Sequence, residues 1–383
     1  MDLLLPFSLF ALLLPDDTGF WMTIVLVFWL AIKILMRTLS DQSYLFVLAV
    51  LAISLSKLFR LGNVSSPTDF LLVLFAFAIG VGRTRNQWQS SLWILASIGS
   101  IAMIRLNIFF GHQALNFLSL DSLAWMLPRF RIMIGGIHFN LSGYLLGSVS
   151  LIGYGMWRYN KYKARWLAFA FAVIAYGLAF LTGSRASTFL PIASVLCAEL
   201  AWKYRSKIKQ KAMLMAMAFF SIALIFSLMI YLPNGPLSSV SSSESARSKV
   251  AQCFFSETTN SWAHFWRGNG GDKVSEDCKR NVVVMHRDGR VSTPHAHNSY
   301  LQVFADYGIF PATLLLLAFI FSLRNSLKMI AAGDGLLGGI GFSLGLFLFF
   351  FGLFDSTLLS VSINQVLTGY LLAISWPKLV PSQ

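Results

Sequence analysis

The sequence has little charge, no internal repeat and no complete nucleotide-binding motif. Only 12% of its 383 residues are Asp, Glu, Lys or Arg, about half the share in a soluble domain, which excludes an ordinary water-soluble fold. The lack of a repeat disfavours transporters built from repeated halves. Residues 266–271 (Trp-Arg-Gly-Asn-Gly-Gly) are rich in glycine but lack the Gly-Lys-Ser/Thr ending of a P-loop, so we interpret them as a flexible loop turn.

Hydrophobic residues make up 56% of the chain, and the mean hydropathy is +0.66. Apolar runs recur along the chain, and most can cross a hydrocarbon core of about 30 Å. They predict an all-α polytopic membrane protein with about twelve transmembrane helices. The runs are 3–15, 19–36, 43–59, 68–82, 90–106, 141–157, 166–182, 185–203, 211–232, 307–323, 335–354 and 357–376. The first run lacks a basic N-terminal region, so we do not interpret it as a cleaved signal peptide.

The net charge of +14 lies in short clusters between the apolar runs. The clusters fall in alternate loops, as the positive-inside rule expects, so they do not indicate nucleic-acid binding. Placing them in the cytoplasm puts both termini inside and residues 233–297 outside. The clusters are Arg83/Arg85, Arg158/Lys161/Lys163/Arg165, Lys203/Arg205/Lys207/Lys209/Lys211 and Arg324/Lys328.

The chain is therefore predicted to be one integral membrane domain, residues 1–383, with two outer segments. Residues 107–140 are aromatic and basic and are expected to lie at the membrane interface. Residues 233–297 are expected to form a large outer loop with short helices. The outer side carries more Lys and Arg than the positive-inside rule predicts, which indicates an anionic ligand there.

Two of the three cysteines, Cys253 and Cys278, fall in the large outer loop. A disulfide and two unpaired thiols both fit this placement, because spacing alone does not establish the geometry. A zinc site that uses His295 and His297 with Cys253, Cys278 or Asp288 is a weaker interpretation. It needs three or four converging ligands, and the spacing matches no zinc-finger pattern.

A polar motif, Thr182-Gly-Ser-Arg185, separates two apolar runs at their outer ends. Arginine offers a planar fork of donors to phosphate oxygens, and a helix that starts here adds its free N–H groups. The motif therefore predicts an anion site. The alternative is an interfacial arginine that reaches lipid headgroups, with Thr182 or Ser184 as an ordinary helix cap.

The outer segment before residue 141 carries further polar candidates. Arg131 is a second candidate for anion binding, and Gly135 and Gly136 allow a tight turn at the membrane surface. Asn140 is expected to cap the following helix.

The large loop re-enters the membrane through a polar sequence that begins His295-Ala-His-Asn-Ser-Tyr. A neutral imidazole near pH 7 can accept a proton from a hydroxyl group, so His297 is a candidate general base. An ordinary hydrogen-bonded interfacial histidine is the alternative. Asn298, Tyr300 and Gln302 favour the catalytic interpretation, because polar residues at the start of a membrane segment are costly unless they line a cavity.

Taken in order, these motifs resemble one family, the O-antigen ligase and polymerase superfamily of bacterial envelope glycosyltransferases. Residues 182–185 resemble its T-G-S-R element, and residues 297–301 with Gly308 are similar to its H-N-x-x-L…G element. Arg247, which follows a serine-rich stretch, resembles the arginine that opens the family's periplasmic loop. Residues 135–143 resemble its asparagine-containing turn. One departure is Pro311, where glycine is commoner.

The resemblance implies a GT-C-like helical fold in a bacterial inner membrane, with a periplasmic active site and no metal or cofactor. The donor would be a glycan on undecaprenyl pyrophosphate, and membrane lipids would surround the protein. His297 would activate the acceptor hydroxyl, while Arg185 and Arg247 neutralise the departing pyrophosphate. The substrate-binding residues would be Arg131, Asn298, Asn140 and Ser184.

The acceptor separates the possible activities. A ligase transfers the glycan to lipid A–core, whereas a polymerase transfers it to a second lipid-linked glycan, and the long outer loop with its histidine motif slightly favours the ligase. A flippase or transporter of lipid-linked sugars is an alternative of another class. Such a protein needs charged residues along its spans, whereas here they collect at the loop edges.

Overall fold

The computed structural model describes the protein at residues 73, 76–77, 80–97, 139–160, 164–182, 184–207, 242–269, 273–281, 296–355 and 362–376. Within these ranges every regular element is a helix, so the all-α prediction is confirmed for this part of the chain. The predicted spans before residue 73, the span at 211–232 and the segment 107–138 with Arg131 lie outside the described residues.

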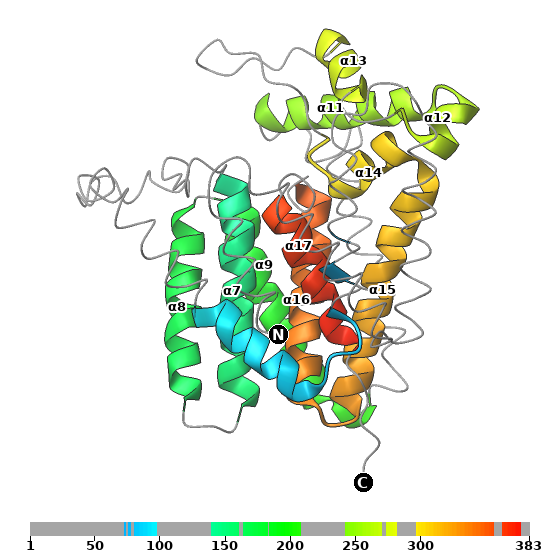
Figure 1. Cartoon of the computed structure of the whole chain (residues 1–383). Coiled ribbons are helices and arrows are strands. Elements are labelled where there is room, and N and C mark those ends of the chain that lie inside the picture. The colour runs from blue at the N-terminus through cyan, green and yellow to red at the C-terminus, as the bar shows by residue number, and fades with distance from the viewer. Residues whose placement is uncertain are drawn as a thin grey trace, which may run out of the picture.

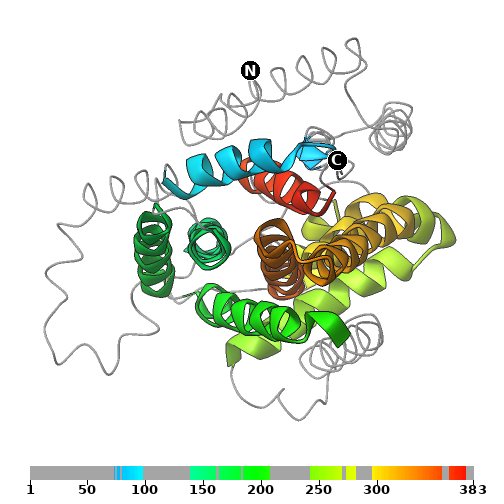
Figure 2. The same cartoon turned by 90° about the horizontal axis from the view of Figure 1, so that it is seen from below.

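Five long helices form a bundle with α16 at its centre (Figures 1 and 2). They are α7 (Phe139–Tyr159), α8 (Arg165–Leu181), α9 (Arg185–Lys203), α15 (Ile309–Ala331) and α16 (Gly335–Phe354). Helix α16 packs against α7, α9 and α15, and also against α17 (Ser362–Leu372). Its residues are mainly leucine, phenylalanine and glycine and are mostly buried, as expected for the central helix of a bundle.

Two of the described helices, α15 and α16, are long and apolar enough to cross a membrane. Helix α8 is a shorter apolar helix, and its large side chains Trp166, Leu167 and Val173 are more than half exposed. Exposed apolar side chains of this kind suit a lipid environment better than water. The structure thus supports a helical membrane protein, while the number of twelve spans stays a prediction.

The observed helix bounds agree with the predicted spans where a polar residue ends the apolar run. Helices α9 and α16 cover the predicted residues 185–203 and 335–354. The predicted span 307–323 differs, because α14 (Ser299–Tyr307) is a separate helix and α15 continues to Ala331. Gly308 separates α14 from α15 with a φ of +90°, a backbone conformation that favours glycine.

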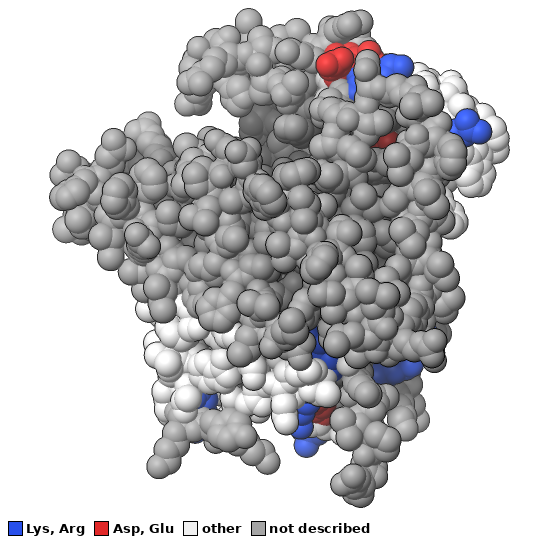
Figure 3. Space-filling view, viewed as in Figure 1, with Lys and Arg blue, Asp and Glu red and all other residues white. Residues whose placement is uncertain are grey.

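One end of the bundle, which we call the basic end, carries the described members of all four predicted cytoplasmic clusters. Contacts at this end join Arg85 to Asp334 and Arg158 to Glu199. Figure 3 shows Lys and Arg side chains at the lower end of the described surface. The helices run alternately toward and away from this end, so the alternation of the clusters with the apolar runs is confirmed for the bundle. Which end faces the cytoplasm stays a prediction.

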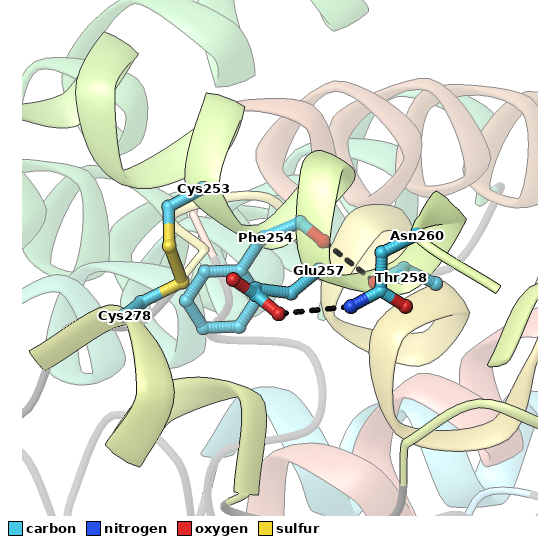
Figure 4. Close-up of a disulfide and its surroundings, with 6 residues drawn as sticks. All are labelled: Cys253, Phe254, Glu257, Thr258, Asn260 and Cys278. Carbon is cyan, nitrogen blue, oxygen red and sulfur yellow. Dashed lines mark hydrogen bonds between the residues drawn. A yellow bond between two sulfur atoms is a disulfide. The ribbon is translucent and has the colours of Figure 1, made fainter. Parts of the chain in front are cut away.

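The predicted loop helices lie beyond the opposite end of the bundle (Figure 1). They are α11 (Ser242–Thr259), α12 (Trp262–Arg267) and α13 (Lys273–Asn281). A disulfide between Cys253 and Cys278 joins α11 to α13, with the two Cα atoms 5.8 Å apart (Figure 4). Phe254 and Cys278 pack in a small hydrophobic cluster that also includes Ala296 and Ala305, so the disulfide-linked helices contact the start of the histidine motif and α14.

Candidate functional site

Asp355, which ends α16, joins two of the sequence motifs. The carboxylate of Asp355 accepts a hydrogen bond from the side-chain amide of Asn140, in the first turn of α7. Its main-chain carbonyl accepts one from the Ser299 hydroxyl, at 2.8 Å, in the first turn of α14. Asp355 is only 9% exposed, so these bonds form in a largely dry environment where polar groups need partners. The ends of three helices therefore meet at one residue, and we call this the motif end of the bundle.

The Thr182–Arg185 motif forms a turn that is held by its own hydroxyl groups. The Thr182 hydroxyl donates to the carbonyl of Ala179 at 2.7 Å and accepts from the Ser184 N–H at 3.3 Å. The Ser187 hydroxyl donates to the Ser184 carbonyl at 2.9 Å. These bonds fix the start of α9, where Arg185 is the first residue. Free N–H groups in the first turn of a helix favour anions at this position.

Helix α7 touches this turn through Gly143. A Cβ atom on Gly143 would lie 2.5 Å from the Ser187 hydroxyl oxygen and 3.2 Å from that of Thr182. The absence of a side chain at Gly143 therefore allows the first turn of α7 to approach the Thr182–Arg185 motif. Together with Asp355, this contact gathers the asparagine, arginine and histidine motifs at the motif end.

The histidine motif makes a tight turn before α14. His297 has a φ of +50°, the only positive φ among the described non-glycine residues. Asn298 caps α14, and its side-chain oxygen accepts from the Tyr300 and Leu301 N–H groups, both at 3.0 Å. The imidazole of His297 is partly exposed. The histidine therefore stands immediately before a well-capped helix.

Two further side chains of α14 stabilise this turn. The Gln302 side-chain oxygen accepts from the Ala296 N–H at 3.2 Å, and its amide donates to Asp306 at 3.0 Å. The Tyr300 hydroxyl donates to the Phe349 carbonyl at 3.2 Å. Burial raises the pKa of Tyr300 well above its ordinary value, so the phenol stays neutral. These polar residues mainly hold the backbone of the motif.

Three sequence interpretations are wrong in detail. Asn140 lies within α7 and bonds to Asp355, so it does not serve as the helix cap. Ser184 occupies the cap position of α9, but its side chain makes no capping bond. Gly268 is not a free loop turn, because a Cβ atom there would lie 2.5 Å from backbone atoms of Asp306 and Tyr307. For Asn140 and Gly268, a neighbouring element that the local sequence does not reveal determines the contact.

The predicted arginines are placed only in part. Arg185 opens α9 at the motif end, and Arg247 belongs to α11 in the loop. The side chains of both arginines lie outside the described part of the structure, as does the whole of Arg131. Their approach to a substrate therefore stays a prediction.

The disulfide weakens the zinc interpretation. Cys253 and Cys278 are bonded to each other, so their sulfur atoms are not free as metal ligands. Within the described ranges, no three His, Cys, Asp or Glu residues gather in a way that could hold a metal ion.

The sequence alone does not single out Asp355. The signal is a lone acidic residue between two apolar runs, at the same predicted side of the membrane as Arg185 and His297. Acidic residues next to a membrane segment are costly unless they have a partner or a role. That cost is the one sequence feature that could have identified Asp355.

No protein-family model matches the chain, and no curated protein matches it either. The family resemblance therefore stays a prediction from the short motifs.

Proposed function

We propose that the protein is a membrane glycosyltransferase of the O-antigen ligase type, which transfers a glycan from undecaprenyl pyrophosphate to a sugar hydroxyl. The observation that carries this proposal is the meeting of three separate motifs at the motif end. Asn140 and Ser299 bond to Asp355, and Gly143 contacts Ser187 beside Arg185. Residues that are far apart in the sequence and share no purely local role are brought together there, as an active site requires.

The chemistry follows from the residue types. His297 accepts the proton of the acceptor hydroxyl as its oxygen attacks the anomeric carbon of the donor sugar. The bond between that carbon and the pyrophosphate oxygen breaks, and undecaprenyl pyrophosphate leaves with the bonding electrons. Negative charge accumulates on the leaving group, so Arg185 and Arg247 stabilise the transition state more than the bound substrate. Arg131 assists, and Asn140, Ser184 and Asn298 contribute to substrate binding. The reaction needs no metal or cofactor.

The environment supports a lipid-linked donor. Helices α8 and α15 expose large apolar side chains such as Trp166 and Phe310, and α15 is long enough to cross a membrane. A polyprenyl chain can lie against such a surface while its pyrophosphate reaches the motif end. We place this end on the periplasmic side of a bacterial inner membrane, with both termini in the cytoplasm, because the positive-inside rule puts the basic end inside.

The decisive test is substitution of His297. In purified protein given lipid-linked glycan and lipid A–core, His297→Ala is expected to reduce transfer at least about 100-fold, as loss of a general base does. Gel analysis of the glycosylated core measures the product. His264→Ala is the matched control, because His264 lies in the same loop and bonds to Asn260. Near-normal transfer by His297→Ala, with the variant present at normal protein levels, would contradict the proposal.

The same assay separates the alternatives. Glycan on the core identifies a ligase, which we favour, whereas ladders formed from donor alone identify a polymerase. Movement of a non-hydrolysable donor across vesicles, without any transfer, identifies a transporter instead.

A further inference from the structure

Helix α12 (Trp-Ala-His-Phe-Trp-Arg) is attached to the core by one aromatic side chain and exposes two others. The Phe265 ring meets the Phe304 ring edge to face at 5.6 Å. Phe304 is only 7% exposed, so this contact belongs to the core. Trp262 and Trp266 lie next to Phe265, with ring centroids 5.7 and 5.5 Å from its own, and they are 75% and 49% exposed. Two tryptophans are thus exposed on a helix that Phe265 attaches to the core.

The backbone fixes the position of α12 relative to α15. A Cβ atom on Gly308 would lie 2.2 Å from the Trp266 carbonyl oxygen, so the end of α12 and the residue that caps α15 are in direct contact. The Asn269 N–H donates to the Ala305 carbonyl of α14 at 2.8 Å and holds the chain after α12 against α14, which directly precedes α15. Since α15 begins at Ile309, α12 lies level with the first turn of a helix that is long enough to cross a membrane.

The exposed tryptophans continue an apolar surface of α15. The exposed side chains of this surface are Phe310, Leu317, Ile320 and Phe321. Figure 1 shows α12 beside the upper end of α15, and in Figure 3 the described surface at the upper right has white areas with Lys or Arg groups among them. If α15 crosses a bilayer with this surface toward lipid, the tryptophans stand where the hydrocarbon meets the headgroups.

We infer that α12 is an interfacial anchor, whose Trp262 and Trp266 insert into the headgroup region of the bilayer that α15 crosses. Tryptophan favours this region because its ring is apolar and its N–H group still reaches polar partners. The occupant is phospholipid rather than a glycan. The two indole rings meet at an interplanar angle of 79°, so they offer no common flat face to a sugar ring.

The anchor is tested by photo-crosslinking in the full-length protein. The variant Trp262→p-azidophenylalanine is reconstituted in nanodiscs of phosphatidylethanolamine and phosphatidylglycerol, illuminated and analysed by mass spectrometry. Phospholipid adducts are expected as the major product at residue 262. Trp266→p-azidophenylalanine is a second variant, and it is expected to give the same adducts.

Two control positions show which adducts a lipid-facing residue and a water-facing residue give in this experiment. Phe321→p-azidophenylalanine, on the exposed face of α15, is expected to capture lipid, whereas Glu276→p-azidophenylalanine, on the exposed part of α13, is expected to react with water. Water adducts at residues 262 and 266, capture of added glycan, or a crosslink to a second copy would each overturn the anchor. The readout needs no donor substrate, so it is independent of the glycosyl-transfer assay.

Discussion

The two ends of the bundle are held together in different ways. At the basic end, the Glu199 carboxylate accepts hydrogen bonds from Tyr154, Arg158 and Tyr159, all from neighbouring α7. The side chains of Arg158 and Glu199 are 40% and 29% exposed. At the motif end, Asp355 is nearly buried and bonds to Asn140 and Ser299, which belong to two different helices.

This difference separates a structural ion pair from a candidate site. Several partly exposed partners share Glu199, so water or a second donor can replace any one of them. Asp355 joins helices from distant parts of the sequence, and a buried amide that loses its acceptor finds no ready substitute. We therefore expect single substitutions to be costly at the motif end and inexpensive at the basic end.

The largest expected effect comes from the disulfide at the motif end. Cys253→Ser is expected to lower the free energy of local unfolding of the loop by about 3 kcal/mol, because the bond closes a long segment of chain. Hydrogen exchange in α11 and α13 measures this change. Cys197→Ala removes the free thiol of α9 and is expected to leave loop exchange as in the wild type. Equal protection in Cys253→Ser and the wild type would contradict the expectation.

The next effect comes from Asp355. Asp355→Ala leaves the Asn140 amide without this acceptor and is expected to cost about 2 kcal/mol of stability and most of the transfer activity. Asp355→Asn keeps one acceptor oxygen and is expected to remain closer to wild type in melting temperature. Glu199→Gln is the counterpart at the basic end and is expected to change melting less than Asp355→Ala. Equal losses of melting temperature in Asp355→Ala and Glu199→Gln would contradict this difference between the two ends.

A smaller effect is expected at Gly143. Gly143→Ala places a methyl group against Ser187 and is expected to cost about 1 kcal/mol through overpacking. Gly177→Ala in α8 is the matched control, since nothing lies within 4 Å of its added Cβ atom. Thermal unfolding in detergent measures both variants. A melting temperature for Gly143→Ala at or above that of Gly177→Ala would show that α7 does not approach the turn this closely.

The smallest effect is expected at Arg158. Arg158→Ala removes a partly exposed ion pair, and Tyr154 and Tyr159 still donate to Glu199, so the cost is expected to stay below about 1 kcal/mol. Transfer activity is expected to be unchanged. Loss of activity in this variant would mean that the two ends are coupled.

The sequence predicts the parts of the fold that depend on local patterns. The apolar runs at 185–203 and 335–354 match α9 and α16, because charged residues end these runs or follow them closely. The break between α14 and α15 is missed, because the predicted apolar run starts at residue 307 and a single glycine does not by itself require a new helix. Its cause is the contact between Gly308 and Trp266, which only the folded chain reveals.

The sequence predicts which residues belong to the candidate site, but not which of them contact one another. The motifs identify His297, Asn298 and Asn140 by residue type and order. They do not reveal that Asn140 bonds to Asp355, because that pair is separated by 215 residues and Asp355 belongs to none of the motifs. Long-range pairs of this kind depend on how α7 and α16 pack.

The backbone at His297 has a consequence for which residues this position can accept. A left-handed φ costs an ordinary residue about 1 kcal/mol, and glycine would avoid that cost. Selection for stability alone would therefore favour glycine at position 297. A histidine at this position fits the proposed role as a general base better than it fits the preference of its own backbone.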